Sequence, residues 1–110
     1  MAGPSISLVN FEGAAALLRA GRCIVSSMKY INEDAAVRFC QIFDAAAAAD
    51  VTVGTTVPVW VLTAGANGGD DDYMGNGIVF TSGIVVAGTT TPDGSTAAAD
   101  NTQHIWAVIE

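Results

Sequence analysis

Basic residues are scarce in this sequence. Arg19, Arg22, Lys29 and Arg38 stand against 11 acidic residues, which gives a formal net charge of -7. Proteins that bind nucleic acid neutralise phosphates with clusters of Lys and Arg, and no such cluster is present. We therefore expect no nucleic acid among the partners of this protein.

Long apolar runs are also missing. A membrane-spanning helix needs about 20 mostly apolar residues, and Gly, Pro, Asp or Arg interrupts every apolar run of this chain before that length. Residues 1–5 lack the basic start and the continuous apolar stretch of a secretory signal. We expect no membrane segment and no Sec export.

Groups for catalysis are few. The single histidine, His104, falls in a predicted strand, where we expect a packed or rim residue, because a general base needs a nucleophile and an orienting partner. The chain has no Gly-x-Ser-x-Gly motif, and Gly75 and Gly77 lack the strand-to-helix context of a phosphate loop. The sequence predicts no enzyme, no catalytic residue and no cofactor.

Cysteine occurs only at positions 23 and 40. A hairpin with its turn at Glu33 and Asp34 would place Cys40 opposite a residue near Ser27. Cys23 would then be too far along the strand to form a disulfide. We predict two free, largely buried thiols.

Apolar residues are abundant, at 51% of the chain, while charged residues reach 14%. Much of the apolar class is alanine, and the larger members are mainly Val and Ile, whose branched side chains favour strands. The low charge predicts apolar surface that a partner covers. The alternative is an average surface whose apolar fraction is raised by alanine.

Short β-type runs alternate with turn-forming segments along the chain. We predict strands over 5–10, 23–32, 36–43, 57–63, 78–81, 84–90 and 103–109. The runs 23–32 and 36–43 are predicted to form a hairpin, with Ile24, Met28 and Tyr30 on one face of the first. A helix is the competing interpretation of 36–43.

The remaining segments complete the prediction. Residues 14–20 have the composition of one or two helical turns that end at Gly21. Residues 64–77 are rich in Gly, Asn and Asp and are predicted to be a long loop. The expected fold is all-β, a β-sandwich of jelly-roll-like type over residues 23–110, with an extended N-terminal arm over residues 1–22.

Two features of this pattern suggest ligands. Asp70, Asp71 and Asp72 offer oxygen ligands for calcium, but adjacent aspartates point in different directions, so we favour a solvated acidic loop and predict no metal site. Trp60 and Trp106 lie on predicted strands, where core or rim packing is favoured over a sugar-stacking role.

Several turn-and-strand motifs carry a resemblance to a known group of proteins. They are Asn32 with 35–39, then 41–45, 53–59, 77–84 and 90–94. With these motifs the segment from Ile24 to Ile109 resembles small structural proteins encoded in the virion-assembly regions of tailed bacteriophages. None of the motifs is catalytic, so the resemblance bears on fold and context.

The resemblance implies a capsid decoration or cement subunit with an all-β sandwich fold. It implies a homo-oligomer, dimer or trimer, that binds the major capsid protein and copies of itself in a virion assembled in the host cytoplasm. The N-terminal arm would reach across neighbouring subunits. The expected protein contacts are Ile6, Leu8, Phe11, Tyr73 and Met74. The alternative is a carbohydrate- or protein-binding domain of a phage tail or fibre, which would use the 64–77 loop with Trp or Tyr side chains.

Overall fold

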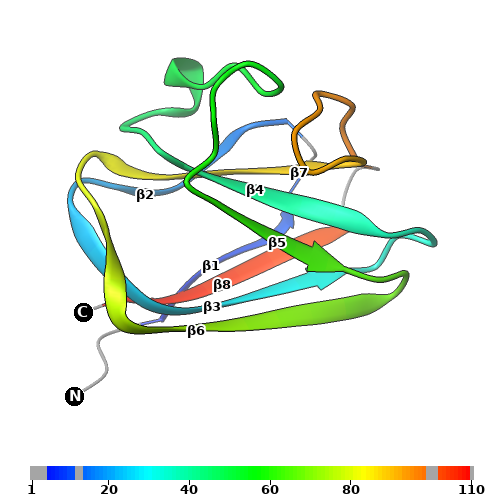
Figure 1. Cartoon of the computed structure of the whole chain (residues 1–110), viewed down its shortest axis with the longest axis horizontal. Coiled ribbons are helices and arrows are strands. Elements are labelled where there is room, and N and C mark those ends of the chain that lie inside the picture. Colours follow the sequence, from blue (N-terminus) through cyan, green and yellow to red (C-terminus); the bar gives the residue numbers. More distant parts are fainter. Residues whose placement is uncertain (1–4, 12–13, 99–101, 110) are drawn as a thin grey trace.

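Two four-stranded antiparallel sheets packed face to face form the protein. The computed structural model describes residues 5–11, 14–98 and 102–109, and within them all side chains except those of 5, 8–11 and 72–76. Sheet A has the order β1 (Ser5–Phe11), β8 (Gln103–Ile109), β3 (Cys23–Asn32), β6 (Gly68–Phe80). Sheet B has the order β2 (Ala16–Ala20), β7 (Gly83–Thr89), β4 (Arg38–Asp44), β5 (Trp60–Ala64). The predicted all-β sandwich is confirmed (Figure 1).

The strands pair in a nested order. β1 pairs with β8, β2 with β7, β3 with β6 and β4 with β5, all antiparallel. The chain is thus one long hairpin that is rolled up, so that successive pairs alternate between the sheets. Only the connection from β4 to β5 stays within one sheet, and every other connection crosses the sandwich.

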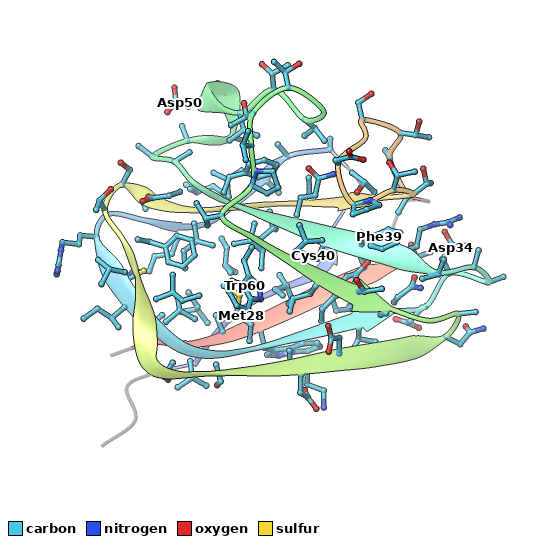
Figure 2. All side chains as sticks on the ribbon, viewed as in Figure 1. Met28, Asp34, Phe39, Cys40, Asp50 and Trp60 are labelled. Carbon is cyan, nitrogen blue, oxygen red and sulfur yellow. The ribbon has the colours of Figure 1, made fainter. Side chains whose placement is uncertain are left out.

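The main core fills the space between the sheets. Its side chains come from β3 to β8 and are the inward-facing members of the strand alternation. Figure 2 shows Met28 of sheet A and Cys40 of sheet B between the two layers. The fully buried members are Val25, Tyr30, Cys40, Ile42, Leu62, Ile84, Val86 and Ile105, each at 0% exposure.

A β-bulge in β3 changes which side chains face the core. Val25 and Ser27 pair with Ile109 and Val108, two consecutive residues of β8, so Ser26 is the extra residue. The Ser26 hydroxyl donates to the Val108 carbonyl at 3.2 Å. Val25 before the bulge and Met28 after it are both buried, whereas Ile24 lies on the opposite face. The predicted shared face of Ile24, Met28 and Tyr30 is therefore wrong.

The predicted hairpin between residues 23 and 43 is also wrong, because β3 and β4 belong to different sheets. The buried side chain of Asn32 holds the crossing between them. Its Nδ2 donates to the carbonyls of Ala36 (2.8 Å), Ala64 (3.3 Å) and Gly65 (3.0 Å), and its Oδ1 accepts from the Asp34 amide (3.0 Å). The competing helix over 36–43 is excluded as well, since β4 is a strand.

Gln103 extends this buried polar network into sheet A. Its Nε2 donates to Asn32 Oδ1 at 3.0 Å, and its Oε1 accepts from the Tyr30 hydroxyl. Burial raises the pKa of Tyr30, so its hydroxyl stays protonated as the donor. Across the sandwich, a Cβ on Gly88 would lie 2.9 Å from Gln103 Cγ, so this position of β7 needs glycine.

The outer face of sheet B is covered by the chain's own connections. Phe43, Val85 and Ala87 point outward from this sheet and form a second core with Ala45 and Val51. Gln41 holds the 90–98 connection over the same face, because its Nε2 donates to Thr89 Oγ1 (3.0 Å) and to the Gly94 carbonyl (3.0 Å). This 90–98 connection and the connection from β4 to β5 (residues 45–59) lie above sheet B in Figure 1.

The turn from β6 to β7 is held by one carboxylate. Asp44 accepts from the amides of Thr81 (2.9 Å) and Ser82 (2.9 Å) and from the Thr81 hydroxyl (3.0 Å). Desolvation acts to raise the pKa of Asp44, but these bonds together outweigh it and hold that pKa below its usual value.

Two further predictions about local structure are wrong. Residues 14–20 contain no helical turn, since 16–20 form β2; so short a helix has little stability alone, whereas pairing with β7 satisfies the backbone. Most of the predicted 64–77 loop belongs to β6, which pairs with β3 from Gly68 opposite Asn32. As an outer strand, β6 needs few apolar side chains.

The residues assigned by sequence to an N-terminal arm supply outer strands of both sheets. β1 is the outermost strand of sheet A and β2 that of sheet B. Within residues 1–22, the described segments therefore lie in the sandwich formed by the rest of the chain. The boundary between residues 22 and 23 falls in the connection from β2 to β3.

Replacing Asn32 should destabilise the protein strongly. In Asn32→Ala, Gln103 Nε2 and the Asp34 amide lose an acceptor, and three carbonyls lose a donor. A buried polar group left unpaired costs about 1–3 kcal/mol, so we expect the free energy of unfolding to fall by roughly 3 kcal/mol. Urea unfolding measures this. The control is Thr55→Ala, at an exposed position. Another asparagine, Asn67, is unsuitable as a control because its φ is positive, at 51°. A loss under about 1 kcal/mol would contradict the role of the network.

Both cysteines should be free thiols that react only after unfolding. Cys23 and Cys40 are unpaired and buried, and burial raises the pKa of each thiol, which disfavours the reactive thiolate. Thiol titration of the non-reduced protein should count two per chain in denaturant and close to none in the native state. A count of zero in denaturant would reveal a disulfide.

Candidate interaction surfaces

The outer face of sheet A has no covering connection among the described residues, unlike that of sheet B. Met28, Tyr30, Ile105 and Ala107 point into the core, so the residues between them point outward. This outer face carries the half-buried apolar side chains of Ile24, Ile31, Trp106 and Val108. It also carries the exposed side chain of Val79. We call it the sheet A face.

Lys29 and Trp106 lie at the centre of the sheet A face. They are directly opposite each other on β3 and β8, the two inner strands of the sheet. Together with Ile31 they line a shallow hollow of about 260 Å³. On the other side of Lys29 lies Asp71 of β6, with 4.0 Å between Nζ and Oδ1. Both charged side chains are more than half exposed, so this ion pair contributes little to stability.

The ring of Trp106 is supported by its neighbours on the same face. It stacks on the His104 ring with centroids 6.1 Å apart and an interplanar angle of 27°. His104 in turn forms a hydrogen bond through Nε2 with the Glu33 carboxylate. His104 is 8% exposed, which agrees with the predicted packed position. Trp106 is half-buried, so part of its ring lies at the surface.

A second apolar surface lies on the approach to β5. Val57 and Val59 are 82% and 49% exposed, with Pro58 between them. Trp60 is 37% exposed and points to the other side of β5, the side on which Ile42 and Leu62 face the core. The Val59 amide donates to the Ile42 carbonyl at 2.8 Å, which fixes this segment along sheet B. We call residues 57–60 the β5 strip. It adjoins the sheet opposite to the one that carries the sheet A face.

The aspartates of β6 lie on the outer strand of sheet A, not in a loop. Asp70 turns toward sheet B, where its Oδ2 accepts from the Thr63 amide at 3.1 Å, whereas Asp71 pairs with Lys29 on the outer face. No group of three metal-ligating side chains occurs among the described residues. Charges on an outer strand also oppose pairing with a foreign strand.

Of the five residues predicted as protein contacts, the structure describes the side chain of Ile6 alone. Ile6 is half buried and packs against the main core. Leu8 and Phe11 pair with Ile105 and Gln103 of β8, and Tyr73 and Met74 belong to β6, but the side chains of all four lie outside the described residues.

Sequence reasoning did not find the sheet A face. The signal was present, because 103–109 is a predicted strand, and the period of two places His104, Trp106 and Val108 on one side. What sequence alone lacks is the knowledge of which side of that strand is covered.

Comparison with known proteins does not assign the chain to a family. No protein-family model matches the sequence, and no curated protein matches it. Within the described part of the chain, no helix has the length and apolar character needed to cross a membrane. The class that the described residues define is a β-sandwich with exposed apolar side chains on the sheet A face and on the β5 strip, among other positions.

Proposed function

We propose that this protein is a non-enzymatic structural subunit that binds protein surfaces and decorates or cements a phage capsid. The observation that carries the proposal is the pair of separate apolar surfaces, the sheet A face and the β5 strip. A subunit that covers a shell needs one contact with its own copies and another with the shell. Exposed apolar surface beyond scattered single residues is typical of such contacts.

Two further features support the proposal. We interpret the nested strand order as a jelly roll, an architecture that recurs in viral capsid and lectin domains, although fold alone does not define function. The net charge of -7 opposes adsorption to DNA, which a protein assembled on a DNA-filled shell must avoid. The phage context itself rests on the resemblance of the sequence motifs.

We assign the β5 strip to the contact with the major capsid protein. It contains Val57, at 82% the most exposed large apolar side chain of the described residues, and proline at position 58 removes a backbone donor that would otherwise invite strand pairing. Contact there is then made by side chains, through burial of apolar area at roughly 25 cal/mol per Å². Attachment should resist moderate salt, because exposed ion pairs contribute little.

Val57→Glu should weaken attachment to capsids about tenfold or more, because burying a valine side chain contributes about 1.5 kcal/mol or more and the new charge would be desolvated. The measurement is co-sedimentation of purified protein with particles that lack it, together with the heat resistance that it restores. Thr55→Glu is the matched control, since it adds the same charge two residues away at an exposed polar position. Full resistance to heat and osmotic shock in particles without the protein would refute the cementing role.

A carbohydrate-binding domain of a tail or fibre is the second candidate function. The predicted 64–77 binding loop is mostly strand, so the observation that favours this candidate is the hollow beside Trp106. There an aromatic ring at the surface lies near Lys29 and Asp71, a donor and an acceptor that suit neighbouring sugar hydroxyls.

The two tryptophans make the second candidate testable. In Trp60→Phe the only tryptophan left is Trp106, so its fluorescence reports on the sheet A face alone. If the candidate is right, neutral oligosaccharides will shift this emission in a saturable manner, and Asp71→Asn will weaken the response. Emission that stays unchanged up to millimolar sugar would exclude it.

A further inference from the structure

We propose that the sheet A face binds the same face of a second copy across a twofold axis that passes close to Lys29 and Asp71. This inference rests on the proposed function, because it assigns the second of the two apolar surfaces to contact between copies. The partner is thus a second copy of this chain, held sheet to sheet.

The need for a cover follows from comparing the two sheets. Sheet B has outward-facing Phe43, Val85 and Ala87, and the chain covers them with its own connections. The sheet A face carries Ile24, Ile31 and Trp106 without such a cover among the described residues. Apolar side chains on the outer face of a sheet are normally buried by another layer of secondary structure. A partner sheet would complete the stack on this side.

The charges of the sheet A face are self-complementary. Lys29 and Asp71 are the charged side chains that the described residues place near its centre, and they lie 4.0 Å apart with opposite signs. In a twofold contact residue i meets residue j and residue j meets residue i, so Lys29 of each copy can approach Asp71 of the other. A foreign partner would not require both signs side by side.

Apart from Glu33, the other acidic side chains that the structure describes lie away from this contact. The chain has a net charge of -7, whereas Lys29 and Asp71 together contribute none, so two copies can meet here without placing like charges at the centre. Glu33, at the end of the face, is paired with His104. Long-range repulsion between copies remains, and salt screens it. Dimers should therefore form at least as well in high salt as in low salt.

The apolar groups have the arrangement of a protein interface. Trp106, a residue type enriched among binding hot spots, lies at the centre against His104, with Ile31 and Val108 beside it. Exposed Ser7 of β1, opposite Trp106 on the outermost strand, supplies a polar group toward the rim. The aspartates of β6 disfavour pairing through that edge of the sheet, which leaves face-to-face packing.

The test exchanges the two charges between copies. In Lys29→Asp both central groups are acidic, and in Asp71→Lys both are basic, so each variant alone should dimerise at least about tenfold more weakly than the wild type. An equimolar mixture should recover dimers, because every contact across the axis then joins opposite charges. Sedimentation velocity of mass-tagged variants distinguishes the mixed dimer from the two parents.

Matched controls account for net charge and folding. Arg22→Asp and Asp93→Lys make the same changes in charge at exposed positions outside the sheet A face, and both should keep wild-type dimerisation. Circular dichroism must show that each variant is folded. A monomeric wild type, or variants that dimerise as the wild type does, would overturn the inference. If a monomeric wild type still restored particle stability, the inference would fall and the proposed function would stand. If the wild type dimerised but did not bind particles, the inference would stand and the proposed function would fall.

Discussion

The crossing of the chain between the two sheets depends on the buried hydrogen bonds of Asn32. One amide side chain joins the end of β3, the 33–37 connection and the end of β5, and through Gln103 it reaches β8. A polar group at 0% exposure is tolerated only when its bonds are made, so this site has few alternative geometries. These bonds fix the place where β3 and β4 pass into opposite sheets.

Strand positions were predictable from sequence where alternation and turn residues agreed. Residues 23–32 and 103–109 form the predicted strands with the predicted bounds, and β7 (Gly83–Thr89) lies within one residue of the predicted 84–90. The errors arose where long-range pairing decides the outcome. Glycine and aspartate at 68–72 indicate a loop, yet the open edge of β3 supplies backbone partners that no local pattern reveals. In the same way, a short polar connection between two strands does not tell whether they share a sheet.

Free thiols were predicted correctly from an incorrect premise. The hairpin register that separated Cys23 from Cys40 does not exist, but both side chains are buried in the main core as unpaired thiols. The candidate surfaces were less predictable than the thiols. Trp106 is visible in the sequence as a strand tryptophan, but its exposure depends on which sheet face the connections cover, and that depends on the strand order.

The pairing of β1 with β8 has a consequence for how the chain reaches this structure. β8 lies between β1 and β3, so sheet A lacks its central strand until residues 103–109 have been synthesised. β1 must then remain without its partner through the synthesis of about ninety further residues. Contacts so distant in sequence slow folding, because loop closure is costly before the pairing compensates for it. Sheet A can consequently be completed only when β8 is present to join β1 to β3.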